Sequence, residues 1–489
     1  MKNKFYIYAI LLAGILFVSC SSYSSSIDLS NKIIKAETDE WLSLGIELPE
    51  NSTIPNDWWS IFEDENLDSI MNVFLVNNYD LKIALLSLEA SKSLAIINGS
   101  SMYPDLNFGM GNSTFQQNTS GTPYEDITLH YHNSETNETT TITIPTSSSS
   151  ENHSLKFSSQ WEIDLWGRMS SKNIAVNKDL ESKQNDYDFI KFSLVSQAVK
   201  IYFNLVESNE QVNLAQSSVE AYGDIFNIVE ERYNQGVRSS LDYRLALSNL
   251  LISKATLEQR KMILDNLKRQ METLMGKYPT GKLSISDNLS TLLPTIPLNL
   301  PSDIIENRPD IVSSYNKVES AEANLDNAVK MKLPSFSLTG SAGTSSSDLT
   351  KILNGDYSVW NLGSNLILPL FQNGKLQANE NLSRSLYEQT QIEYIHTVLK
   401  AFSEIENKLT ISQMLENQLV ALDDAYVQTK EAYQLAKDRY DKGLTDLITV
   451  LDSQKRMFDT KGQMISVRKE LIENRIDLLV CLGGSFSED

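Results

Sequence analysis

The sequence is poor in the residues that build metal sites and disulfide frameworks. It has only two cysteines, Cys20 and Cys481, and four histidines among 489 residues. Two cysteines cannot form a zinc cluster or a disulfide framework, and four histidines leave little material for imidazole chemistry. No Ser-His-Asp arrangement, HExxH motif or phosphate-binding glycine loop stands out. We therefore predict no catalytic residue, no metal site and no cofactor, which argues against an enzyme.

Positive charge is also scarce. The chain carries 42 Lys and Arg against 63 Asp and Glu, a net charge of −21. A chain this acidic repels a phosphate backbone, and no locally basic face stands out, so we predict no nucleic-acid partner. Apolar residues make up 41% of the chain, which is enough to build hydrophobic cores and excludes global disorder.

The N-terminus has the features of an export signal. Two lysines precede an apolar run from Phe5 to Val18, which is too short to span a bilayer and is typical of a signal peptide. The run ends in Leu16-Phe17-Val18-Ser19-Cys20, and a serine-rich stretch follows. We predict a signal peptide at 1–19 and a flexible tether at 20–57. An ordinary signal peptide with an incidental cysteine is the alternative.

Proline is absent from two long windows. Gly167 to Tyr278 and Leu370 to Asp489 contain none of the 12 prolines and span 112 and 120 residues. Because proline breaks the interior of a helix, both windows are predicted to be almost wholly helical. Two adjacent apolar stripes in the first window indicate two helical neighbours, as in a curved layer of helices, although a broad stripe on an ordinary bundle helix gives the same pattern.

The two windows are copies of each other. Glu231-Arg232-Tyr233-Asn234-Gln235-Gly236-Val237 matches Asp438-Arg439-Tyr440-Asp441-Lys442-Gly443-Leu444 at a constant offset of 207. In each copy a helical stretch leads into the glycine, which can adopt the left-handed geometry that ends a helix, and a shorter helix follows. The sequence therefore predicts a duplicated helical hairpin whose long helices reach about 105 Å.

Four short segments outside the helical windows alternate apolar and polar residues. In the clearest one, Leu155, Phe157, Trp161 and Ile163 alternate with polar residues. This pattern predicts a strand with one apolar and one polar face. A half-buried soluble sheet gives the same alternation, but the signal peptide and the long helices favour a transmembrane β-barrel.

Four strands cannot close a membrane barrel, because the smallest barrels need about eight and an open edge leaves backbone groups unpaired in lipid. The chain must therefore oligomerise. Two copies would supply about eight strands, and the interior of an eight-stranded barrel is filled by its own side chains. A conducting pore therefore favours three copies and about twelve strands.

Several segments together carry a family resemblance. They are Trp161-Glu162-Ile163-Asp164-Leu165-Trp166-Gly167-Arg168, Asn307-Arg308-Pro309-Asp310-Ile311, Leu368-Pro369-Leu370-Phe371-Gln372-Asn373-Gly374, and Arg439-Tyr440-Asp441-Lys442-Gly443-Leu444-Thr445-Asp446 with Val450-Leu451-Asp452. The chain resembles the TolC-like outer-membrane channels, specifically the lipoprotein branch that serves tripartite efflux pumps. The N-terminal segment resembles a lipobox, which implies lipidation of Cys20.

The resemblance implies a mainly α fold with a β-barrel part. Duplicated long hairpins would form an α-barrel, and four strands from each protomer would share a 12-stranded membrane β-barrel in a homotrimer. The first repeat is expected at 58–286, a linker at 287–301 and the second repeat at 302–489. Strands are expected at about 103–116, 153–166, 333–343 and 357–371, and helices at about 64–100, 167–236, 239–276, 303–332, 372–443 and 446–482.

The resemblance also implies a function and a set of sites. The chain would be a passive exit channel for small molecules, in contact with outer-membrane lipid, a periplasmic adaptor (membrane fusion) protein and an inner-membrane pump of the resistance-nodulation-division type. The residues expected at the adaptor-docking hairpin tips are Arg232, Gly236, Val237, Arg439, Gly443, Leu444 and Thr445. Those expected at the periplasmic aperture are Ile448, Thr449, Asp452 and Asp242.

Two other functions remain open from the sequence. One is a structural or adhesive surface lipoprotein built on a long helical rod, which would explain the helices and the tether but not the four alternating segments. The other is a duct for type I protein secretion. An outer-membrane location extending into the periplasm is expected for the efflux channel.

Overall fold

The computed structural model describes residues 57–118, 128–133, 138–143, 147–290 and 308–482. The predicted signal peptide at 1–19, the lipidation site Cys20 and all but the last residue of the tether at 20–57 lie outside the described residues. So do most of the predicted linker at 287–301 and the first residues of the helix predicted at 303–332.

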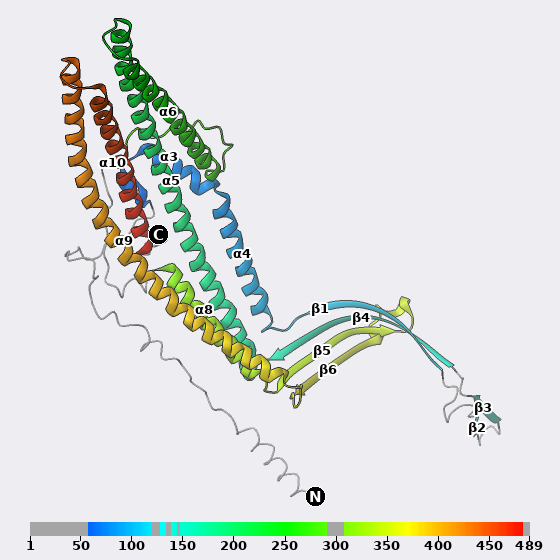
Figure 1. The fold of residues 1–489 in the computed structure, drawn as a ribbon. Helices are drawn as coiled ribbons and strands as arrows, with labels where there is room; N and C mark the ends of the chain where they lie inside the picture. The colour runs from blue at the N-terminus through cyan, green and yellow to red at the C-terminus, as the bar shows by residue number, and fades with distance from the viewer. Residues whose placement is uncertain (1–56, 119–127, 134–137, 144–146, 291–307, 483–489) are drawn as a thin grey trace.

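Two long helical hairpins dominate the molecule (Figure 1). The first consists of α5 (Arg168–Asn234) and α6 (Ser240–Leu274), and the second of α9 (Lys375–Asp441) and α10 (Leu447–Cys481). Every boundary of the second hairpin lies 207 residues after its counterpart in the first. The 67 residues of α5 and of α9 give a rise of about 100 Å each. The offset of 207 residues between the two repeated segments therefore applies to both helices of each hairpin.

The N-terminal helix is divided, contrary to the single helix predicted at 64–100. A 3-10 turn, η1 (Trp58–Phe62), leads into α3 (Glu65–Asn77) and then α4 (Tyr79–Ser100). The break occurs because Asn78 leaves the helical geometry, with a ψ of 130°, and its side chain accepts a hydrogen bond from Leu81 N at 2.9 Å. Asn78 Nδ2 also donates to the carbonyl oxygen of Leu274, which ties the break to the end of α6.

The second copy has a corresponding tie made by a different residue. Helix α8 spans Pro309–Lys330, so it begins after Arg308 rather than before it as predicted. Arg308 precedes the helix in an extended conformation, and its Nη1 donates to the carbonyl oxygen of Cys481 at 3.2 Å. Cys481 is the duplicate of Leu274, at the same offset of 207. Each short helix is therefore fastened to the end of its own hairpin.

A four-stranded antiparallel sheet extends from the helices (Figure 1). Its order is β1 (Asn107–Asn118), β4 (Ser147–Ile163), β5 (Ser335–Ser346) and β6 (Ser358–Ile367). The strands are shifted from the predicted ranges; β4 begins six residues before the predicted 153, because its serine-rich start pairs with the end of β1. Part of the long connection after β1 forms a second sheet of β2 (Thr128–Asn133) and β3 (Glu138–Thr143). Two short 3-10 turns, η2 (Leu349–Lys351) and η3 (Gly355–Tyr357), join β5 to β6.

Helices and strands follow one order across the molecule. Near the sheet, α4 packs on α5, α5 on α8 and α8 on α9. Each of these helices adjoins one strand in the chain, namely β1, β4, β5 and β6, and these strands neighbour each other in the same order. Farther from the sheet the order is α6, α5, α10 and α9. The protomer is therefore a single curved wall with α4, α6 and β1 at one edge and α9 and β6 at the other.

The hydrophobic core lies between neighbouring helices of this wall. The largest cluster packs Trp58, Phe62 and Phe74 of the N-terminal segment against Phe192 and Tyr202 of α5. Within the described residues, α5 is the one helix long and apolar enough to cross a membrane, and 56% of that stretch is buried in the protein. The N-terminal segment thus braces the middle of the helical wall.

Candidate functional site

Most side chains of the sheet sort into one apolar and one polar face, with Phe115, Val359 and Ile367 as apolar exceptions on the polar face. The register places Phe108 opposite Phe157, Trp161 opposite Leu338, and Phe336 opposite both Ile163 and Leu366. The other face pairs Gln160 with Thr339, Glu162 with Ser337, and Ser337 with Asn365. Apolar side chains remain exposed in the protomer, as with Phe108 (63%), Leu362 (75%) and Leu366 (64%). An exposed apolar face of this size indicates contact with lipid, while the polar face suits water.

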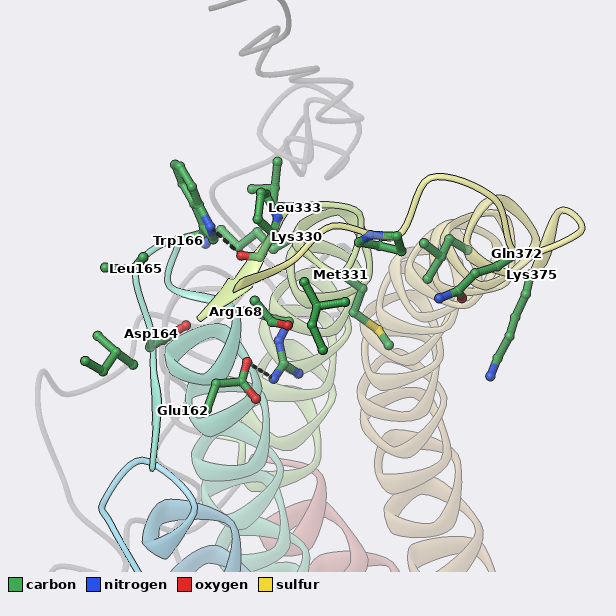
Figure 2. A pocket seen from close by; sticks show the side chains of 16 residues that line it. Glu162, Asp164, Leu165, Trp166, Arg168, Lys330, Met331, Leu333, Gln372 and Lys375 are labelled. Atoms are coloured by element: carbon green, nitrogen blue, oxygen red, sulfur yellow. Dashed lines mark hydrogen bonds and ion pairs between the residues drawn. The ribbon is translucent and has the colours of Figure 1, made fainter. Parts of the chain in front are cut away.

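A tight joint connects β4 to α5. Trp161 Nε1 donates to the carbonyl oxygen of Met102, beyond the end of α4, and Trp166 Nε1 donates to that of Pro334, just before β5. Asp164 accepts from the backbone nitrogens at the start of α5, and Gly167 takes a φ of 73°. A cavity of about 330 Å³ lies at this level (Figure 2). The segment from Trp161 to Arg168, which carries part of the family resemblance, therefore holds together the end of α4, the start of α5 and the start of β5.

Both hairpin tips have the same backbone geometry. Gly236 and Gly443 have φ values of 74° and 70°, in the left-handed region predicted for them. Val237 N donates to the carbonyl oxygen of Arg232 at 2.9 Å, and Leu444 N to that of Arg439 at 2.8 Å. These bonds close the ends of α5 and α9 and turn the chain sharply into the shorter helices.

The return helices begin with matching caps. Ser239 accepts from Asp242 N at the start of α6, and Asp446 accepts from Thr449 N at the start of α10. Asp446 also accepts from Thr449 Oγ1 at 2.6 Å, and these bonds hold the pKa of its carboxyl below the ordinary value. Thr449, predicted at the aperture, is therefore part of a helix cap.

The two tips meet through Arg232, which was predicted for adaptor docking, and through three residues that were given no role from the sequence, Arg238, Tyr440 and Asp441. Arg232 Nη2 lies 3.5 Å from Asp441 Oδ1, across the two hairpins. The guanidinium groups of Arg232 and Arg238 lie 5.2 Å and 4.7 Å from the ring centre of Tyr440. Arg238 has Thr445 as its duplicate, so the repeat itself gave no reason to choose it. Arg439, the duplicate of Arg232, has no corresponding contact among the interactions found in the described residues.

The predicted aperture residues lie on the first turns of two helices. Ile448 (58% exposed) and Asp452 share one side of α10, while Asp242 lies in the first turn of α6. Asp452 forms an ion pair with Arg456 at 2.8 Å, and both side chains are more than half exposed. Arg456 was not predicted, although its spacing of four residues from an acidic residue on a helix is a recognisable signal. The structure thus places the guanidinium group of Arg456 beside the predicted acidic residue Asp452.

The predicted docking residues remain accessible at the two tips. Val237 is 68% exposed and Leu444 is 64% exposed, whereas Thr445 is half-buried. The region of the chain that the structure describes contains no group of three or more His, Cys, Asp or Glu residues placed to hold a metal ion. Exposed apolar tips of this kind suit contact with another protein.

The long helical wall and the two-faced sheet define a channel-forming protein of the outer membrane. Comparison with known families agrees: the model of the outer membrane efflux protein family matches residues 70–277 and 300–484. The chain belongs to this family. The predicted resemblance, fold class and outer-membrane location are therefore confirmed.

Individual relatives cover most of the chain. It is 24% identical over 434 residues to the cation efflux system protein CusC of Escherichia coli, covering 88% of each chain. It is 26% identical over 445 residues to the pyoverdine export outer membrane protein OpmQ of Pseudomonas putida, again covering 88% of each. The solved CmeC outer membrane channel of Campylobacter jejuni superposes with a TM-score of 0.79 at 26% identity, over 91% of this chain and 92% of that one.

Proposed function

We propose that three copies of this chain close into one channel that serves as the passive exit duct of a tripartite efflux system. The observation that carries the proposal is the open wall of the protomer: within the part of the chain that the structure describes, the edge strands β1 and β6 each pair with another strand on one side only. In lipid these edges need partners, because unpaired backbone groups cost several kcal/mol each. Pairing β6 of one copy with β1 of the next would give a closed barrel of twelve strands.

The helical edges support the same arrangement. Leu81, Leu88 and Ala95 of α4 are buried toward α5. On the opposite side of α4, helical spacing aligns five exposed apolar side chains: Tyr79, Ile83, Leu86, Leu94 and Ile97, each at least 56% exposed. At the other edge of the wall, Leu382 and Leu386 of α9 are 58% and 48% exposed. Two different apolar edges favour head-to-tail contacts that close into a ring.

In the alternative function, a structural or adhesive surface lipoprotein, the exposed apolar surfaces of the sheet and of α4 and α9 would have no partner. A structural or adhesive lipoprotein displayed as a single rod would leave the apolar face of the sheet and both helical edges in water. A closed ring in a membrane covers all three. The family relationship also supports an efflux role over adhesion.

A first experiment is reconstitution of the mature protein in planar lipid bilayers. We expect a trimer in detergent that dissociates on heating, and stepwise conductance with cation preference. Asp452→Asn should lower that preference, because it leaves Arg456 unpaired near the mouth of the pore. Well-folded protein with neither a trimer nor conductance would contradict the channel. Unchanged selectivity in Asp452→Asn would contradict only the assignment of Asp452 to the aperture.

The hairpin tips are proposed to bind a periplasmic adaptor that couples the duct to a resistance-nodulation-division pump. The exposed apolar side chains Val237 and Leu444 and the paired tips support this choice. A photo-reactive residue at Leu444 should form crosslinks to an adaptor in intact cells. The matched control is Leu353, which is 84% exposed at the far end of the sheet and should form none. Recovery of a type I secretion partner at Leu444 would instead favour protein export.

A further inference from the structure

An ion pair lies where the sheet meets the helices. Glu162, near the end of β4, and Arg168, the first residue of α5, approach to 2.6 Å between Oε1 and Nη2. The two side chains are 32% and 30% exposed, so water reaches both. In Figure 2 they face each other beside the cavity, and Trp166 lies apart from them near Leu333. The aperture and docking roles described above do not involve this pair.

The register assigns Glu162 to the polar face of the sheet. It lies opposite Ser337, which in turn lies opposite Asn365 on β6. Its neighbours in the strand, Trp161 and Ile163, belong to the apolar face, because successive side chains of a strand point to opposite sides. In a barrel whose apolar face contacts lipid, Glu162 must face the bore.

The other charged groups around this level have separate partners. Asp164 accepts from the backbone nitrogens of Met169 and Ser170. Lys330 contacts Asp326 at 2.5 Å, and Lys332 contacts Glu380 at 2.5 Å. Lys375, which also lines the cavity, points away from the ion pair in Figure 2. Asp164 keeps its negative charge, and Glu380 is shared by Lys332 and Arg384, which leaves one positive charge, so these groups offset each other. A substitution of Glu162 or Arg168 therefore changes the balance of charge at the joint by one unit in each protomer.

We propose that Glu162 and Arg168 form a charge-balanced collar at the base of the barrel, and that their balance sets the ionic selectivity of the channel at this level. The inference rests on the proposed trimeric channel, in which the pair is repeated three times around the bore. In the native protein each carboxylate cancels one guanidinium, so the collar is neutral. Removing either partner leaves three like charges around the path of the ions.

The size of the effect follows from Coulomb's law with salt screening. Three unit charges at about 10 Å from the pore axis change the local concentration of a monovalent ion roughly twofold at 0.1 M salt. The change shrinks at 1 M salt, where the screening length falls to about 3 Å. Ion permeability measured at low salt is therefore the sensitive observable.

Single and double neutral variants test the collar in planar bilayers. The unbalanced charge raises the local concentration of one ion about twofold and lowers that of the other about twofold, so the ratio of the two changes roughly fourfold. Glu162→Gln should therefore lower the ratio of cation to anion permeability roughly fourfold, and Arg168→Gln should raise it by a similar factor. The double variant with both changes should recover the native ratio, because its collar is again neutral. A pair that only stabilises the joint would shift both single variants in the same direction or not at all, and that result would overturn the proposal.

A second set of variants avoids the ion pair in case its loss prevents folding. Ser337, opposite Glu162 on the polar face, offers an uncharged position at the same level. Ser337→Asp should raise the permeability ratio and Ser337→Lys should lower it; equal ratios in both would refute the collar. Absence of any conductance from the native trimer would contradict the proposed channel itself, whereas native conductance with insensitive variants would contradict only the collar.

Discussion

Replacing Leu86 with aspartate should leave the protein monomeric in detergent. Leu86 is 67% exposed at the centre of the apolar stripe on α4, on the side opposite the contact with α5. In the proposed ring this stripe is covered by the next copy, so each of three interfaces would acquire a buried carboxylate. An unpaired buried charge costs several kcal/mol, which is enough to separate the copies. Light scattering on the purified protein would give the mass directly.

A residue on another side of α4 provides the control for that substitution. Ile96 is 73% exposed and lies about a quarter of a turn from the nearest residue of the stripe. Ile96→Asp makes a matched apolar-to-acidic change on the same helix and should leave the trimer intact. If Leu86→Asp remained trimeric and conducting, the stripe on α4 would not be the contact between copies.

Arg308→Ala should be the most destabilising single substitution outside the hydrophobic core. Arg308 is only 4% exposed, and its guanidinium contacts Asp310 at 2.8 Å, Glu404 at 2.6 Å and the carbonyl oxygen of Cys481. Burial lowers the pKa of Arg308, but the two carboxylates outweigh it and the net shift is upward. Its removal frees the start of α8 from α9 and α10, and breaking a buried pair typically costs about 3–5 kcal/mol. The midpoint of thermal unfolding measures the loss.

Two further variants separate the contribution of the Arg308 contact network to stability from the contribution of a positive charge alone. Arg308→Lys keeps the positive charge but loses the planar fork that reaches three partners, so an intermediate loss of stability is expected. Lys261→Ala removes a lysine that is 50% exposed and paired with Glu258, and should cost about 0–1 kcal/mol. A loss in Arg308→Ala no larger than in Lys261→Ala would show that the buried network contributes little.

The sequence predicted the hairpins and the faces of the strands because their signals are local. A proline-free window and a repeated Arg-Tyr-x-x-Gly segment specify α5, α9 and both tips without knowledge of any contact. Alternation along β4 fixes which side chains share a face, and the register then aligns Trp161 with Leu338 across the sheet. Periodic backbone structures carry this information within a few residues.

Features that depend on distant contacts were not predictable in the same way. Asn78 divides the N-terminal helix because its side chain caps α4 and also reaches Leu274, nearly two hundred positions later in the chain. The stacking of Arg238 on Tyr440 joins the two hairpins of one chain, and no residue spacing in either hairpin indicates this contact. The extent of β4 was underestimated because its first residues are polar and are recognisable as strand only through pairing with β1.

The joints between strands and helices have a mechanical consequence. Only four residues separate Ile163 at the end of β4 from Arg168 at the start of α5, and hydrogen bonds from two tryptophans hold that joint to its neighbours. Such a joint is too short and too well fixed to act as a free pivot. A force applied at a hairpin tip must therefore bend the long helix itself, because the end of the helix at the sheet is held in place. Displacement at the tip would then be set by the elastic stiffness of about 100 Å of helix.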